Sequence, residues 1–241
     1  MEETSEIDFF GNGLLSHCFY AEEELFYFKN FHTITEDAWA KKDNDLISHI
    51  GNYLKGFPKE QHEDIIEYNT YALHLNQKKY PSMHRESLVI LIYNFLEDEL
   101  NKLCNIISEC IENKIKLKDL DGKGIHRAQN YLTKVGDFDF SKISQEWAYI
   151  KSVNLLRNQI VHSGGCLPED PCHKLNKFIS QESTLLGKPG GNIFLDPDFI
   201  GKLIDVLIKF FKKLDHEVKS FMESPPEKPS TLAMPPASPL K

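Results

Sequence analysis

The sequence has very little arginine. It contains 28 basic residues, of which three are arginine and the rest lysine, against 36 acidic residues, so the formal net charge is −8. This balance excludes a large, nonspecific nucleic-acid-binding surface, which is usually basic, but it leaves room for a small basic site. In a chain that uses so few arginines, Arg157 is better explained by the planar fork of its donors than by bulk charge.

Long apolar runs and paired cysteines are also lacking. The longest nearly uninterrupted apolar run, "LVILIYNFL", is about half of a membrane span. The opening residues "MEETSEIDFF" are acidic where a secretory signal is basic. The five cysteines are odd in number and irregular in spacing, which favours reduced thiols over a disulfide framework. We therefore expect a cytoplasmic protein with no membrane contact.

Proline is scarce except at the C-terminal end. The segment "ESPPEKPSTLAMPPASPLK" holds half of the chain's 12 prolines and few large apolar residues. Such a segment cannot bury enough surface to offset the entropy of ordering it. The sequence therefore predicts a disordered, Pro-rich tail over residues 224–241.

The remaining sequence has mainly helical periodicity. Apolar residues at three- and four-residue spacing predict helices over 21–31, 38–56, 58–79, 81–115, 122–136, 141–162 and 197–222. Pro58, Pro81 and Pro197 suit first helical positions, and Ser141 is a plausible N-cap. About 30 residues after His162, rich in Gly, Pro, Cys and Ser, are expected to form a loop, followed by a short extended piece.

The strongest helical signal lies in the middle of the chain. No glycine follows Pro81 before about residue 115, so the pattern predicts one long central helix. The residues expected to form its core face are Val89, Ile92, Leu96, Leu100, Leu103, Ile107 and Cys110. The fold class expected is all-α, a bundle of four to five core helices over 81–223 with an N-terminal helical extension over 1–80.

The stretch "VNLLRNQIVHSGG" (153–165) carries a polar set on an amphipathic helix that ends at two glycines. At about 100° per residue, Asn154, Asn158 and Lys151 share one face, opposite the apolar residues. Arg157 and His162 lie about 140° apart, too far to act together on one atom. A second copy of the helix across a two-fold axis would supply the missing half of a site.

This residue pair suits cleavage of a ribose phosphodiester. Histidine can take and return a proton near neutral pH, and arginine presents several donors to a phosphate whose charge grows in the transition state. Asn158 could orient either group. No metal or other cofactor is needed when the 2′-hydroxyl of RNA is the nucleophile.

The segment "RNQIVH" matches the R-N-x-x-x-H motif, and over roughly 80–220 the chain resembles the HEPN superfamily. The order of elements agrees: a long helix with an acidic middle ("FLEDELNKLC"), then "GIHRAQNYL", the motif helix, and a closing helix ("IFLDPDFIGKLIDVLIKFF"). The resemblance implies a helical bundle, a homodimer and, in many members, a metal-independent endoribonuclease whose composite site joins Arg and His of two protomers.

By position, the resemblance makes Arg157 and His162 catalytic and Asn158 supporting. Lys151, Asn154 and Arg127 are candidate RNA contacts. Many members act as toxins or in defence against phage, so an antitoxin or other partner protein is expected. A toxin subset carries a modified Tyr two residues after the His. Here that position is Gly164, so inactivation by that route is not expected.

Two other clusters allow different readings. Glu97, Asp98 and Glu99 could do acid–base work or hold a metal, but such a run is more often a solvated helix face. A second cluster offers zinc-ligand types at unfamiliar spacing: His162, Cys166, Cys172 and His173.

The alternative function is a non-catalytic HEPN-like helical module that binds a partner protein or a nucleotide, which the acidic charge favours.

Overall fold

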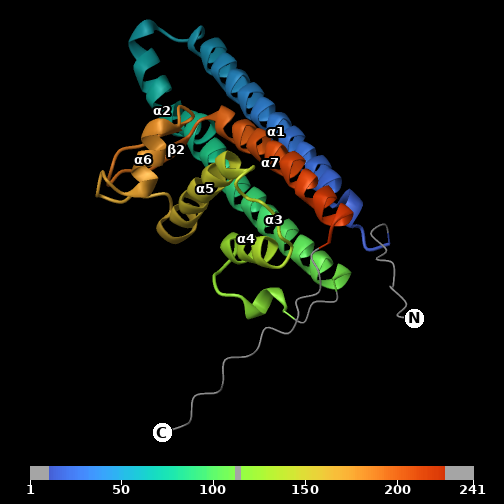
Figure 1. Ribbon diagram of the computed structural model, residues 1–241. Coiled ribbons are helices and arrows are strands. Elements are labelled where there is room, and N and C mark those ends of the chain that lie inside the picture. The colour runs from blue at the N-terminus through green and yellow to red at the C-terminus, as the bar shows by residue number, and fades with distance from the viewer. Residues whose placement is uncertain (1–10, 112–114, 226–241) are drawn as a thin grey trace, which may run out of the picture.

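The computed structural model describes residues 11–111 and 115–225, and it shows the expected all-α helical bundle (Figure 1). The α-helices are α1 (His17–Leu54), α2 (His62–His74), α3 (Tyr80–Cys110), α4 (Ile125–Lys134), α5 (Ser144–Ser163), α6 (Lys174–Gln181) and α7 (Pro197–Glu223). Short 3-10 turns occupy Leu14–Ser16, Lys59–Gln61 and Leu117–Asp119, and a π-helical segment spans Leu75–Lys79. A two-stranded antiparallel sheet pairs β1 (Leu185–Leu186) with β2 (Phe194–Leu195).

Helix α3 is the long central helix that the sequence predicts, and it packs against α1, α4, α5 and α7. All seven residues expected on its core face are buried, among them Ile92 and Leu100, which have no exposed surface. Removing this much apolar surface from water is the main stabilising term for such a bundle. These four helices are therefore positioned by α3, and one of them is α5, which carries the motif.

Helices α1 and α7 lie side by side along most of their length (Figure 1). The expected helices 21–31 and 38–56 are one continuous helix, which corrects the sequence interpretation. The connecting residues "HTITED" contain neither glycine nor proline, so nothing in them breaks the helix. The buried side chains of α1, such as Leu25, belong to the same core as those of α3 and α7.

The chain also stays helical where a helix was expected to begin at Pro81. Proline lacks an N–H and crowds the preceding turn. The π-helical segment Leu75–Lys79 lies just before it, and a widened turn is one way in which a helix accommodates such a disturbance. No loop or linker therefore separates residues 1–80 from 81–223.

The expected loop after His162 contains more regular structure than its composition suggested. It includes the eight-residue helix α6 and strand β1, which correct the loop prediction. The short extended piece was predicted, and it is strand β2. Ser141 is not the N-cap of α5, because that helix begins at Ser144. The predicted tail over 224–241 lies almost wholly outside the described residues.

No helix in the described part of the chain combines the length and the apolar character that a membrane crossing requires.

Candidate functional site

Helix α5 holds the motif residues on the side that its core face leaves free. Val153, Leu156 and Ile160 are buried against the bundle. Arg157 is half-buried, whereas His162 in the last helical turn is exposed. The helix thus presents the arginine near the surface and the histidine at its end.

The end of α5 was predicted correctly. Gly164 adopts a left-handed conformation with φ 57° at the C-cap, and Gly165 follows with φ 79°. Glycine takes up this conformation without the steric cost that a Cβ brings. A Cβ at Gly165 would also come within 3.1 Å of the Cγ2 atom of Ile193. The two glycines therefore end the helix directly after His162.

The guanidinium of Arg157 bridges α5 and α3. Its Nη1 donates to Oδ1 of Asn158 at 3.1 Å, and its Nη2 donates to Oδ1 of Asn94 at 3.1 Å. The Cζ atom lies 5.7 Å from the centroid of the Tyr93 ring, within the range of a cation–π contact. The arginine is therefore held in one place by two amides and an aromatic ring.

A further amide fixes the first of these partners. Nδ2 of Asn158 donates to Oδ1 of Asn154 one turn earlier on α5, at 3.2 Å. Because its Nδ2 donates to Asn154, Oδ1 of Asn158 is left to accept from Arg157. The structure therefore places Asn158, expected to support the site, and Asn154, expected to contact RNA, in one hydrogen-bonded chain with the arginine.

No carboxylate of the described residues pairs with Arg157. Among the described residues the guanidinium makes no ion pair, and both of its hydrogen-bond partners are uncharged amides. A guanidinium has five N–H donors, and these two bonds use two of them. Its Nε is buried and has no hydrogen-bond partner among the described residues. The remaining Nη hydrogens and the positive charge can therefore serve an anionic ligand such as a phosphate.

Tyr93 serves the site as a packing surface. Its side chain is only 4% exposed. Burial raises the pKa of Tyr93, the nearby negative charge of Glu97 adds to this effect, and Arg157 opposes it. The phenol is therefore neutral at ordinary pH, and its ring contributes a face for the guanidinium.

The structure does not bring His162 into contact with Arg157. Within the described part of the chain, His162 makes no hydrogen bond and no ion pair, and its helix position lies about 140° around from the arginine. Lys151, the candidate RNA contact two turns before Arg157, is likewise exposed. A site that uses both Arg157 and His162 needs atoms from outside one copy of the chain.

Arg127 lies on α4, whereas the acidic run begins at Glu97, one turn after Tyr93 on α3. Nε of Arg127, at the start of α4, donates to the carbonyl of Gly122 at 2.9 Å. The Glu97 carboxylate lies against Gly124, where a Cβ would come within 3.3 Å of it. Lys102 pairs with the exposed Asp98 at 2.8 Å, as on a solvated helix face, and with Glu99 at 2.7 Å. The Glu99 carboxylate is largely buried and also lies 3.6 Å from Nε2 of His17.

The zinc cluster considered from the sequence does not form in the described residues. Cys166 and Cys172 are exposed free thiols, and Nδ1 of His173 accepts from the N–H of Leu175 at the start of α6. The described side chains that do gather as possible metal ligands are His32, Glu36 and His84, which the sequence analysis missed.

Asn94 and Tyr93 were also missed as parts of the Arg157 site. The sequence carries one weak signal, because Asn94 is an amide inside the apolar run "LVILIYNFL". Comparisons with family models, with curated proteins and with solved structures found no match to this chain. The interpretation of the site therefore rests on its residues and their geometry.

Proposed function

We propose that this protein is a metal-independent endoribonuclease of HEPN type that acts as a homodimer in the cytoplasm. The observation that carries the proposal is the Arg157 guanidinium, which Asn94 and Asn158 hold without a carboxylate from the part of the chain that the structure describes. A positive group that is positioned in advance and not neutralised is suited to the charge that develops on a phosphate in the transition state.

The reaction assigns a role to each motif residue. The 2′-oxygen of a ribose attacks the adjacent phosphorus, the bond to the 5′-oxygen breaks, and a 2′,3′-cyclic phosphate remains. His162 of one protomer takes the proton of the 2′-hydroxyl, and His162 of the other returns one to the leaving 5′-oxygen. Arg157 stabilises the phosphate, while Asn158 and Asn94 keep the guanidinium in position. Lys151, Asn154 and Arg127 remain candidate RNA contacts.

The surroundings of the site support an interface with a second copy. Leu91 is 49% exposed and lies three residues before Asn94 on α3, while Val161 is 44% exposed and lies four residues after Arg157 on α5. Residues three or four apart share a helix face, so both apolar side chains flank the arginine. A two-fold contact through this face would cover them and bring the two α5 helices together.

The biological setting is proposed on the family resemblance. Enzymes of this kind commonly act in phage defence or as the toxin of a toxin–antitoxin pair. An antitoxin or other partner protein would then control the activity. Gly164 stands where a modified Tyr occurs in one toxin subset. We therefore propose control by a route other than modification of that side chain.

The chemistry is tested by incubating purified protein with several RNAs in EDTA and analysing the new ends. The proposal predicts cleavage that persists in EDTA and leaves 2′,3′-cyclic phosphate together with 5′-hydroxyl ends. Cleavage that requires a divalent metal, or that leaves 5′-phosphate ends, would contradict it.

The alternative is a non-catalytic HEPN-like helical module that binds a partner protein or a nucleotide. The observation in its favour is a set of exposed aromatic side chains on α1: Phe19, Tyr20, Phe26, Tyr27 and Phe31. Contiguous exposed apolar surface commonly marks an interaction site. This alternative is favoured if the folded, dimeric protein cleaves none of the RNAs.

A further inference from the structure

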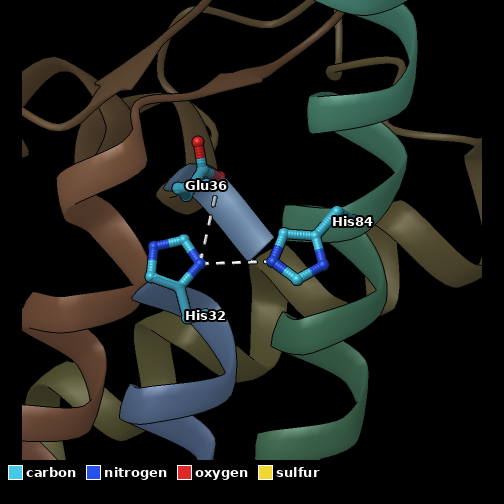
Figure 2. A group of neighbouring side chains, drawn as sticks. All are labelled: His32, Glu36 and His84. Carbon is cyan, nitrogen blue, oxygen red and sulfur yellow. Dashed lines mark hydrogen bonds and ion pairs between the residues drawn. The ribbon is translucent and has the colours of Figure 1, made fainter. Parts of the chain in front are cut away.

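Three side chains from two helices meet beside the start of α7, away from the Arg157 site. His32 and Glu36 lie one turn apart on the same face of α1, and His84 projects toward them from α3 (Figure 2). One ligand atom from each residue lies within 4.8 Å of the others. Imidazole nitrogens and a carboxylate oxygen are the ligands of many zinc sites.

The spacing of the two histidine nitrogens fits one small ion, and the carboxylate oxygen lies somewhat farther away. Nδ1 of His32 lies 3.3 Å from Nε2 of His84 and 3.9 Å from Oε1 of Glu36. Bonds of about 2.0–2.1 Å at tetrahedral angles place two ligand atoms roughly 3.3 Å apart. The pair of histidine nitrogens therefore already has the spacing of two ligands of one ion.

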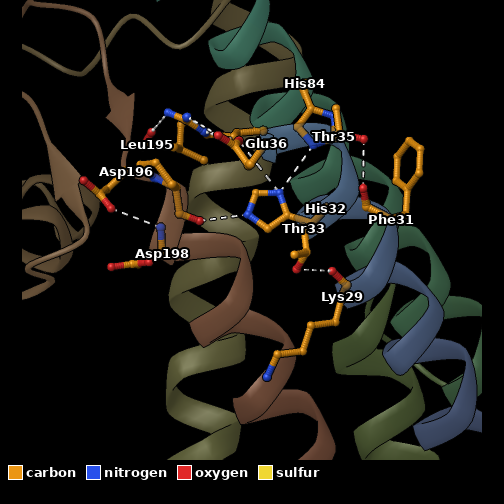
Figure 3. A network of polar contacts seen from close by, with 12 residues as sticks. Lys29, Phe31, His32, Thr33, Thr35, Glu36, His84, Leu195, Asp196 and Asp198 are labelled. Atoms are coloured by element: carbon orange, nitrogen blue, oxygen red, sulfur yellow. Dashed lines mark hydrogen bonds and ion pairs between the residues drawn. The ribbon is translucent and has the colours of Figure 1, made fainter. Parts of the chain in front are cut away.

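The second nitrogen of His32 selects the tautomer of the neutral ring. Nε2 lies 2.9 Å from the carbonyl oxygen of Pro197, the first residue of α7 (Figure 3). A carbonyl can only accept, so in the neutral ring Nε2 carries the hydrogen and Nδ1 presents its lone pair to the cluster. The Asp196 side chain accepts from the N–H of Asp198 at 3.0 Å and so holds this end of α7 in place. Histidines that bind metals commonly donate their other N–H to such an oxygen.

The carboxylate of Glu36 is held from its other side. Arg85 donates from Nε to Oε1 and from Nη2 to Oε2, both at 2.7 Å, and from Nη1 to the carbonyl of Leu195 at 2.9 Å. Each carboxylate oxygen has more than one acceptor position, so Oε1 can accept from Arg85 and still bind an ion. The arginine thus orients the carboxylate as an outer partner.

The charge of this group selects the kind of ion. Arg85 offsets the carboxylate, so the site has no excess negative charge with which to hold a hard cation such as Ca²⁺ or Mg²⁺. Two imidazoles suit a borderline ion such as Zn²⁺, Co²⁺ or Ni²⁺. A cavity of about 610 Å³ between α1 and α7 is lined by both His32 and Glu36, and it can supply water as a further ligand.

We propose that His32, Glu36 and His84 bind one divalent transition-metal ion of the zinc class. His32 binds through Nδ1, His84 through Nε2 and Glu36 through a carboxylate oxygen. In this arrangement the hydrogen of neutral His84 resides on Nδ1, and the ion replaces the hydrogen bond between the two rings. The ion would join α1 to α3 and, through the carbonyl of Pro197, to α7. The proposal stands apart from the RNA-cleavage site and does not depend on it.

The test is metal binding by untagged full-length protein, because a histidine tag would bind the same ions. All proteins in the test carry Cys166→Ser and Cys172→Ser, because both thiols are exposed and would bind zinc themselves. The protein with only these two substitutions is called the background protein. Zinc affinity is measured by competition with a chromophoric chelator. The coordination geometry of the ion is determined from the visible absorption of bound Co²⁺. Matched variants are His32→Gln and His84→Gln, with His126→Gln, an exposed histidine on α4, as the control.

The proposal predicts one ion per chain, a Co²⁺ spectrum of low coordination number and a higher melting temperature with Zn²⁺. Each site variant is expected to weaken zinc binding by more than about tenfold, and the control to leave it unchanged. His84 is half-buried, so His84→Gln keeps the test available if His32→Gln fails to fold. The proposal is overturned if the background protein binds no ion, or if His84→Gln binds as tightly as the background. RNA cleavage measured in EDTA is unaffected by either result.

Discussion

Nη2 of Arg157 on α5 donates to Oδ1 of Asn94 on α3 across 3.1 Å, joining residues 63 positions apart in the chain. Substituting Asn94→Ala removes this bond and leaves one amide to hold the guanidinium. We expect RNA cleavage to fall by about tenfold or more, because a transition-state donor must be positioned in advance. Asn94 is exposed, so stability should change by no more than about 0.5 kcal/mol.

The control for this substitution is Asn105→Ala, which removes an exposed amide from the same helix. Cleavage rates and thermal unfolding are measured for both variants. Equal activity of the Asn94 and Asn105 variants would show that the bond to Arg157 has no part in the reaction.

The form of the arginine side chain should matter as much as its charge. Lysine at position 157 keeps the charge, but its single ammonium group cannot reproduce the flat fork that meets Asn94 and Asn158 and lies over Tyr93. Arg157→Lys should therefore lower cleavage by about 100-fold. Lys134→Arg, an exchange of the same two cations at an exposed position on α4, is measured under the same conditions and should stay close to wild type. Full activity of Arg157→Lys would mean that bulk charge is sufficient.

The proposed interface can be tested without altering a motif residue. Leu91→Glu places a charge in the apolar face beside Asn94, and burying an unpaired charge in an interface is strongly unfavourable. We expect the protein to become monomeric and to lose cleavage while it remains folded. Leu186→Glu, at a leucine that is 58% exposed on β1, is the control. Sedimentation and activity are compared, and a fully active Leu91→Glu monomer would rule out the composite site.

Acid should weaken the link between α5 and α7. Nζ of Lys213 lies 2.7 and 2.9 Å from the carboxylate oxygens of Glu146. Burial raises the pKa of Glu146, but the hydrogen bond and charge of Lys213 outweigh it, so the pKa in the folded protein is lowered. The resulting stability is present above the unfolded-state pKa of about 4.3 and is lost as the pH falls through the lower folded value.

Glu146→Gln should therefore lower the free energy of unfolding by about 1 kcal/mol at neutral pH, since Lys213 is partly exposed and its charge is screened. The difference from wild type should shrink as the pH falls below about 4. Glu23→Gln, at an exposed position on α1, should show no such trend. Urea unfolding at several pH values measures both, and a difference that stays constant with pH would rule out the ion pair as its source.

The helices were predictable wherever a strict apolar period runs for many residues, as in α3. The prediction failed where the signal is local and weak. The missed α6 has only eight residues between segments rich in Gly, Pro and Cys. The continuity of α1 between the predicted helices 21–31 and 38–56 was missed because polar residues interrupt the apolar stripe there. Those residues include no helix breaker, so the helix itself continues.

The candidate site was predictable only as far as one helix extends. Arg157, Asn158, Asn154 and His162 follow from positions along α5. The pairing with Asn94 depends on how α5 packs on α3, which no local pattern specifies. The second cluster was predictable to the same extent. The four-residue spacing of His32 and Glu36 is visible in the sequence, but the approach of His84 depends on how α1 packs on α3.

The most direct test of the central claim is the cleavage rate of His162→Ala beside that of His126→Ala, in EDTA and at matched folding and oligomeric state. His162 is exposed and without a partner in the described part of the chain, so its removal should leave stability unchanged. The account predicts that His162→Ala loses cleavage by at least about 100-fold, as befits a general acid or base, while His126→Ala cleaves like wild type. Equal rates for the two variants would contradict the assignment of an active site to "RNQIVH".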